Sequence, residues 1–168
     1  MEIILIAIIV IIVFVLMGGA LIVLSPVFVP LIIYSVVQNR LFKKEYKAYL
    51  QSIEGKKFFV YTSRTNSYSY IKINLLPQLP KDVEVIYLNG KDPITNLNKK
   101  YISHALYSIQ DKKGFPYLLR VENGEINDKS INNVFYNTKN QNKDIQLLLN
   151  QIDHFFKTPN HSTKSQPN

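Results

Sequence analysis

The N-terminal part of this 168-residue chain restricts the possible folds more than any other part of the sequence. The run Ile3–Val37 holds 35 residues and no charged side chain, and Glu2 is the single charge before Arg40. About 20 apolar helical residues span the hydrocarbon core of a bilayer, so Ile3–Leu24 alone is long enough to cross it. We expect a transmembrane anchor over residues 1–38 and one further domain, which excludes a wholly soluble, a fibrous and a multidomain protein.

Glycine and proline residues within the anchor leave the number of passes open. Gly18-Gly19, Ser25-Pro26 and Pro30 interrupt the apolar run. Because proline removes a helical hydrogen bond, we expect a kink or a break near residues 25–30. Residues 27–37 then either continue a tilted helix or fold back as half of a short hairpin. A cleavable signal peptide is the competing interpretation, but the basic N-terminal region is missing and the apolar stretch is too long.

Basic residues follow the anchor directly and predict its orientation. They are Arg40, Lys43, Lys44 and Lys47. Because positive flanks stay in the cytoplasm, we expect the domain on the cytoplasmic face of a bacterial inner membrane, for one pass or for a hairpin. Residues 39–55 are predicted to form a basic amphipathic juxtamembrane helix. This helix either holds anionic lipid headgroups or serves as a topology signal and spacer, and the lipid bilayer is its expected partner.

Residues 56–156 alternate between strand and helix patterns. Strands are predicted at 56–62, 82–88 and 115–121, with a fourth from Ile126, and helices at 67–76, 98–110 and 142–156. Asn66 or Ser67 is expected to cap the first of these helices. Asn123-Gly124 predicts a tight hairpin, while 130–138 shows no clear pattern and 157–168 is expected to be a disordered tail. This order indicates an α/β domain with a four-stranded mixed sheet and helices on both faces.

Three segments of this domain carry a resemblance to a known family. Phe59-Val60-Tyr61-Thr62 resembles the first strand of a glutaredoxin. The stretch 114–119, followed by 121–125, is similar to the family's cis-proline strand and its hairpin, and 75–79 with 82–86 is similar to the first helix end and the second strand. Residues 56–156 therefore resemble the thioredoxin and glutaredoxin superfamily, and the resemblance implies a thioredoxin-like fold.

The same resemblance indicates where the family's redox site would lie, and the residues at that place cannot perform thiol chemistry. It places the family's redox motif on Asn66-Ser67-Tyr68-Ser69 and its cis-proline on Pro116. The chain contains no cysteine, so neither disulfide exchange nor a single-thiol mechanism is possible. The implied groove is either a retained binding site or a vestige. Its residues are Tyr61, Asn66, Ser67, Tyr68, Ser69, Phe115 and Pro116.

Two hypotheses for function follow. The first is a redox-inactive interaction module that holds an unidentified protein partner at the membrane. The alternative is a glutathione-binding or transferase-like enzyme, in which Ser67, Tyr68 or Ser69 activates the thiol of glutathione. We expect no catalytic constellation and no cofactor, because no serine-nucleophile motif and no phosphate-binding glycine loop is present.

We also expect neither metal nor nucleic acid as a partner. The three histidines, His104, His154 and His161, show no zinc-ligand spacing. Eleven tyrosines and a net charge of +8 are compatible with nucleic-acid binding, but no recognition motif accompanies them.

Overall fold

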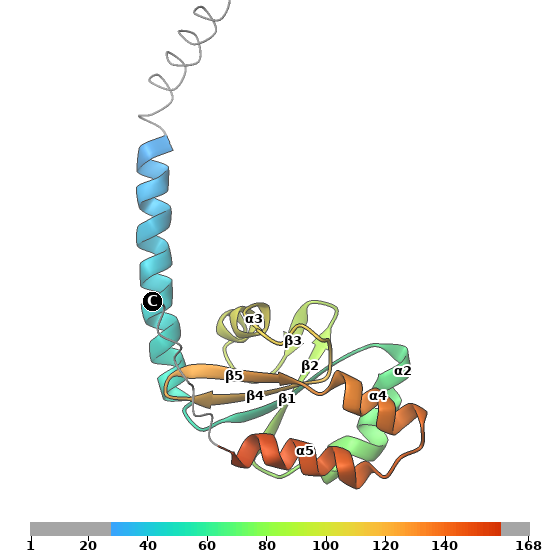
Figure 1. Cartoon of the computed structure of the whole chain (residues 1–168). Coiled ribbons are helices and arrows are strands. Elements are labelled where there is room, and N and C mark those ends of the chain that lie inside the picture. The colour runs from blue at the N-terminus through green and yellow to red at the C-terminus, as the bar shows by residue number, and fades with distance from the viewer. Residues whose placement is uncertain (1–27, 159–168) are drawn as a thin grey trace, which may run out of the picture. The chain divides into compact units, whose positions relative to one another are not determined.

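The computed structural model describes residues 28–158 (Figure 1). The predicted span Ile3–Leu24 lies outside this range, as do the start of the predicted interruption at 25–30 and residues 159–168 of the predicted tail 157–168. The first residue of that predicted tail, Lys157, is the last residue of a helix in the structure. Between residues 28 and 158, no helix combines the length and the apolar character needed to cross a membrane. The chain divides into two compact units, with the boundary between Glu45 and Tyr46.

The described part of the first unit is helical. The backbone is helical from residue 28 through residue 52, which carries the helix across the unit boundary. Every residue from 28 to 41 is exposed, including the large apolar side chains of Phe28, Ile32 and Ile33. No side chain in this segment is buried.

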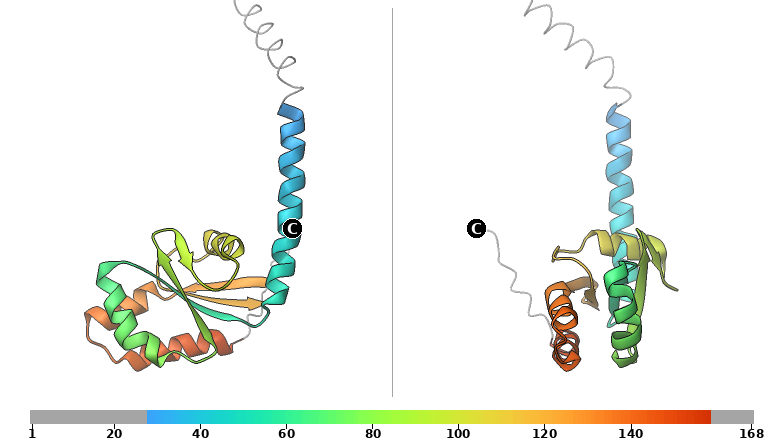
Figure 2. Two further views of the ribbon diagram at one scale, coloured as in Figure 1. Left: turned by 180° about the vertical axis from the view of Figure 1, so that it is seen from behind. Right: turned by 90° about the vertical axis from the view of Figure 1, so that its right-hand side faces the viewer.

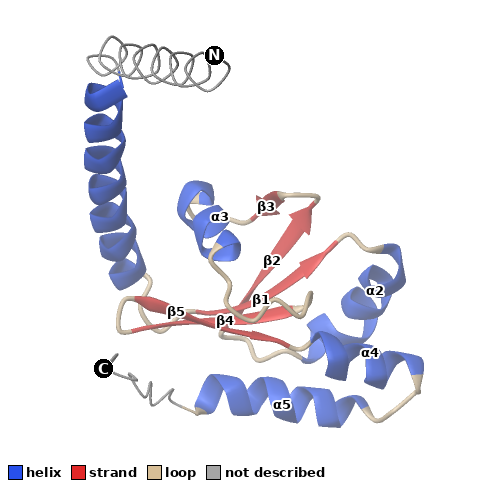
Figure 3. Ribbon diagram, turned by 45° about the horizontal axis from the view of Figure 1, so that its top comes forward, coloured by secondary structure: helices blue, strands red, loops and turns tan. Residues whose placement is uncertain are grey.

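The second unit contains a mixed five-stranded sheet in the order β3-β2-β1-β4-β5 (Figure 3). Its strands are β1 (Lys57–Thr62), β2 (Val83–Asn89), β3 (Asp92–Ile94), β4 (Tyr117–Glu122) and β5 (Glu125–Ser130). β1 and β2 are parallel, and the other neighbours are antiparallel. The α/β class and the mixed sheet are as predicted.

The prediction of four strands is wrong, because β3 adds a fifth strand at the edge. Gly90 adopts a positive φ of 64°, which lets the chain reverse after β2 and pair back onto it. Pro93 lies opposite Leu88 in this short edge strand. Proline is tolerated at such an edge, where a missing N–H is not needed by a further strand.

Helices cover both faces of the sheet. They are α2 (Thr65–Tyr70), continued by a π-helical turn (Ile71–Leu75) and a 3₁₀ turn (Leu76–Gln78), α3 (Lys99–Tyr107), α4 (Asn132–Asn140) and α5 (Ile145–Lys157). The predicted cap at Asn66 or Ser67 is wrong, because Arg64 occupies the N-cap and no side chain caps the helix. α4 covers most of residues 130–138, the stretch in which the sequence shows no clear pattern.

Strict alternation along β1 divides the hydrophobic core into two clusters. Phe59 and Tyr61 pack against α4, α5 and the turn after α2, whereas Phe58 and Val60 pack against α3 and the end of the first helix. Leu50 and Ile53 belong to the second cluster. Figure 2 shows α3 in yellow and α5 in red on opposite sides of the sheet. The predicted covering of both sheet faces is confirmed.

Candidate functional site

The predicted motif, residues 66–69, lies within α2, which follows β1 at the carboxyl end of the parallel strands β1 and β2. Asn66 and Ser69 are exposed, and Tyr68 is half-buried. Ser67 is only 4% exposed, and its hydroxyl donates a hydrogen bond of 3.1 Å to the carbonyl oxygen of Arg64. A ligand at the surface therefore has access to Asn66, Tyr68 and Ser69 but not to Ser67.

Three tyrosine rings gather at the start of α2, and we call Tyr61, Tyr68 and Tyr87 the tyrosine cluster. Their ring centroids lie 5.2 to 6.1 Å apart. Tyr87 was not singled out from the sequence. The parallel register of β1 and β2 places it directly beside Tyr61, and nothing in the local pattern of β2 indicates that pairing.

Lys72, one turn beyond Tyr68, adds a cation to the cluster. Its Nζ donates a hydrogen bond of 3.2 Å to the Tyr68 hydroxyl and lies 5.1 Å from the centroid of that ring. This hydrogen bond is the main cause of a raised pKa for Lys72. Burial, with a smaller contribution from Tyr68, raises the pKa of Tyr61. At neutral pH the cluster thus presents aromatic surface with a protonated Lys72 and an un-ionised Tyr61 hydroxyl.

Pro116, directly before β4, lies beside Tyr61 at the end of β1. The antiparallel register pairs Val60 with Tyr117, so the preceding residue, Pro116, comes next to Tyr61. The Phe115–Pro116 peptide bond is cis. The backbone N–H of Ile131 donates to the Pro116 carbonyl at 3.0 Å. The start of β4 is therefore tied to the entry of α4.

Phe115 does not join the tyrosine cluster. Its ring packs edge-on against Tyr117 with a centroid distance of 4.8 Å, and it contacts the hydrophobic cluster on the α3 face. Asn132 Nδ2 donates a 2.6 Å hydrogen bond to the Phe115 carbonyl. The structure thus brings Tyr61, Tyr68 and Pro116 to one end of the sheet, while Phe115 faces the other core.

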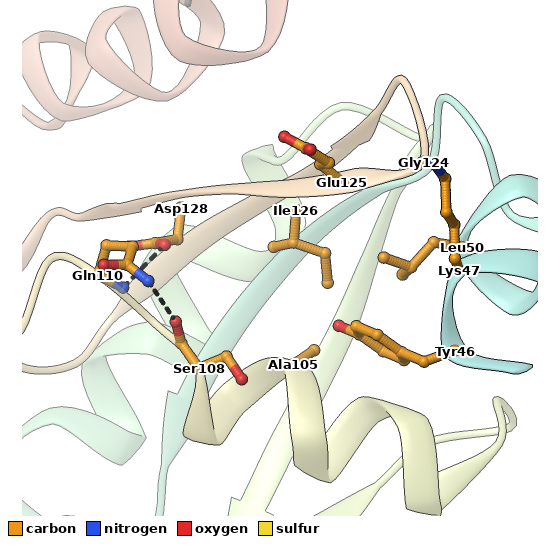
Figure 4. Close-up of a pocket in the computed structure, with 10 residues that line it drawn as sticks. All are labelled: Tyr46, Lys47, Leu50, Ala105, Ser108, Gln110, Gly124, Glu125, Ile126 and Asp128. Atoms are coloured by element: carbon orange, nitrogen blue, oxygen red, sulfur yellow. Dashed lines mark hydrogen bonds between the residues drawn. The ribbon is translucent and has the colours of Figure 1, made fainter. Parts of the chain in front are cut away.

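The four predicted membrane-surface residues have different surroundings. Arg40, Lys43 and Lys44 are exposed on the helix of the first unit. Lys47 is also exposed but belongs to the second unit, where it lines a cavity of about 290 Å³ (Figure 4).

This cavity has an apolar floor and a polar rim. Leu50, Ala105 and Ile126 point into it, as Figure 4 shows. Burial, with a smaller effect of Tyr49, raises the pKa of Tyr46 to about 12, so the Tyr46 phenol at the wall is neutral. The Asp128 carboxylate accepts hydrogen bonds from the backbone N–H groups of Gln110 and Asp111. The cavity is lined from three segments far apart in the sequence, and no sequence signal marks it.

One buried cation was also missed by the sequence analysis. Arg120 is 6% exposed, and its guanidinium donates to the carbonyl oxygens of Phe155 and Thr158 at 3.1 and 2.7 Å, and to Glu122 at 2.8 Å. These carbonyls lie at the C-terminal end of α5, where a cation is favourable. Arg120 therefore fixes α5 to the sheet.

Within the described residues, no group of three or more His, Cys, Asp and Glu side chains could hold a metal ion. The His104 ring packs edge-on against Tyr46, with a centroid distance of 4.7 Å. His154 is exposed near the end of α5, and His161 lies outside the described range.

Comparisons with known proteins identify no relative. A scan of family models, a search of curated proteins and a search of solved structures each found no match to this chain. The superfamily assignment of residues 56–156 therefore stays a proposal.

Proposed function

We propose that this protein is a membrane-tethered, redox-inactive module whose thioredoxin-like domain binds a partner protein at the end of the sheet formed by β1 and β2. One observation carries the proposal. The segment that the resemblance assigns to the redox motif lies within α2, directly after β1, and it has Asn66 and Ser69 where a thiol mechanism needs sulfur. The tyrosine cluster packs beside it.

The order of elements supports the thioredoxin-like part of the proposal. The sequence β1, α2, β2, α3, β4, β5, α5 is the order on which the resemblance rests, with β3 and α4 as additions. Asn123 and Gly124 both have positive φ and form the hairpin between the last two strands. The cis bond before Pro116 is at the position that the resemblance marks.

The character of the exposed surface supports binding rather than turnover. Tyrosine side chains are enriched at protein interfaces, because they supply large contact areas together with a hydrogen-bonding hydroxyl. Tyr68 and Tyr87 are half-buried, so part of each ring is accessible. Protonated Lys72 beside them can pair with a carboxylate of the partner. The Ser67 hydroxyl is buried and bonded to the backbone, which is unsuitable for activating a thiol.

The membrane tether is supported by the first unit. The exposed helix from residue 28 to 37 carries no charged side chain and Ser35 is its one hydroxyl besides that of Tyr34, and such a largely apolar surface is unfavourable in water. It continues the uncharged run that begins at Ile3. The basic flank from Arg40 favours a domain on the cytoplasmic side of that membrane.

Site-specific photo-crosslinking tests the binding site. A photoreactive amino acid replaces Asn66 in the full chain within its native membrane, and the matched control carries it at Tyr107, which is 90% exposed on α3. We expect a discrete protein adduct from position 66 and none from position 107. No adduct at position 66, or the same adducts at both positions, would contradict the proposal.

Retention on immobilised glutathione tests the enzyme alternative. The full chain, kept in detergent micelles, should pass through the resin without retention. A different result would favour the alternative hypothesis, a glutathione-binding protein, over the interaction module. That result is retention that is reversed by free glutathione and abolished by Tyr68→Phe or Ser69→Ala.

A further inference from the structure

Three basic side chains lie on one face of the first helix, immediately after its apolar part. We call Arg40, Lys43 and Lys44 the basic stripe. Their spacing of i, i+3 and i+4 places them side by side on a helix surface. All three are exposed. Lys47 is not included, because it lines the cavity of the second unit.

The stripe carries an uncompensated positive charge. Among residues 28–158, none of its three members forms an ion pair. Glu45 is the single acidic residue between positions 28 and 45, and its place in the helical repeat is away from the stripe. The charge therefore requires counterions or an anionic partner.

The neighbouring surface defines the chemistry of that partner. Arg40 and Lys44 follow Val37, the last apolar residue of the run, by about 5 and 10 Å along the helix axis. Both distances are comparable to the Debye length of about 8 Å at physiological ionic strength, so charges at the end of the apolar run still interact with the stripe. A partner for the stripe must thus present negative charge directly beside an environment that accepts the apolar side chains of residues 28–37.

We infer that the basic stripe binds the headgroups of anionic phospholipids at the bilayer surface. The inference rests on the proposed membrane tether and adds a lipid preference to it. A soluble phosphate compound or a nucleic acid matches the charge but leaves the apolar helix next to it uncovered. An anionic bilayer satisfies both surfaces together, because the hydrocarbon core covers the apolar part and the headgroups neutralise the stripe.

The composition of the bound lipid tests this inference. The full chain is reconstituted in bilayers of equal parts phosphatidylcholine and phosphatidylglycerol, extracted gently, and its bound lipids are quantified by mass spectrometry. Each basic side chain near a surface favours anionic lipid by roughly fivefold. We expect phosphatidylglycerol to be enriched several-fold over phosphatidylcholine.

Three variants separate the stripe from general charge effects. R40Q/K43Q/K44Q should reduce the enrichment to near unity, and R40K/K43R/K44R, which keeps the charge, should retain it. The matched control K81Q/K91Q/K112Q removes three exposed lysines of the domain and should leave the enrichment unchanged. Glutamine and lysine have similar helix propensities, so the helix is preserved.

The outcomes distinguish the inference from the tether. Insertion into the bilayer without a preference for phosphatidylglycerol overturns the lipid inference and leaves the tether intact. Equal loss of enrichment in the stripe variant and in the control also overturns it. Failure of the full chain to enter either a neutral or an anionic bilayer overturns the proposed tether itself.

Discussion

Two apolar segments of similar composition lie in opposite environments in this protein. The central residues of β1, Phe58 to Tyr61, are at most 4% exposed between two layers of helices. Phe28, Ile32 and Ile33 are more than half exposed on the first helix. The chain supplies its own cover for β1, whereas the described residues leave these helical side chains exposed. Local hydrophobicity alone does not distinguish these cases.

The largest predicted effect compares one side chain from each segment. Phe59→Ala leaves a cavity in the core and should lower the free energy of unfolding by about 3–5 kcal/mol. Ile32→Ala should leave the unfolding of the domain unchanged. Urea unfolding of the full chain in detergent micelles, followed by tyrosine fluorescence, measures both. Similar losses for the two variants would mean that the helix is part of the core.

The second prediction places a charge on the exposed helix. Ile32→Asp should weaken membrane retention, because an ionised side chain within a bilayer costs up to about 2.5–3.5 kcal/mol. Ile73→Asp, at a position that is 71% exposed on the domain, is the control and should have no effect. Carbonate extraction of membranes measures the retained fraction. Equal retention of Ile32→Asp and the native chain would contradict the placement of this helix in the bilayer.

The third prediction concerns a polar contact that the domain supplies internally. Glu54 accepts hydrogen bonds from the backbone N–H groups of Asn123 and Gly124 at 2.6 and 2.9 Å. Glu54→Gln should lower the free energy of unfolding by about 1–2 kcal/mol, because a neutral amide replaces the charged acceptor of two turn N–H groups. Glu125→Gln, at an exposed position in the same hairpin, is the control and should change it by less than about 0.5 kcal/mol.

The smallest effect is expected at the surface ion pair of Lys57 and Asp82, whose atoms Nζ and Oδ2 are 2.6 Å apart. The hydrogen bond from Lys57 lowers the pKa of Asp82. A depressed carboxyl pKa stabilises the fold above the unfolded value near 4, and this contribution disappears as the pH falls. Asp82→Asn should therefore cost less than about 1 kcal/mol at pH 7 and nothing near pH 2. A cost that grows towards low pH would contradict this assignment.

Much of the domain is visible in its sequence because the signals are local. The aromatic and β-branched run of β1, the alternation in β2, the Asn123-Gly124 turn and the apolar stripe of α5 each predict an element that the structure contains. β3 has only three residues and includes a proline, so no periodicity marks it. α4 is rich in asparagine and has few apolar residues on its buried face, which hides it from the same criteria.

The site is less predictable than the fold because its contacts are long-range. The start of α2 could be located by resemblance, but Tyr87 joins Tyr61 only through the register of the two strands. Phe115 is predicted in the groove by its place beside Pro116, but its ring packs against Tyr117 and the cluster on the α3 face. The buried Arg120 depends on the carbonyls of α5, which follow 35 residues later in the chain.

The central claim is that a bilayer covers the helix from residue 28 to 37. Because the chain has no native cysteine, single cysteines for spin labels can be placed at each position from 28 to 45 of the reconstituted protein. We predict that labels from 28 to 37 are accessible to oxygen and protected from a water-soluble nickel complex around the whole helix, with the reverse from Arg40 onward. Nickel access at residues 28–37, or protection on one helical face alone, would contradict the claim.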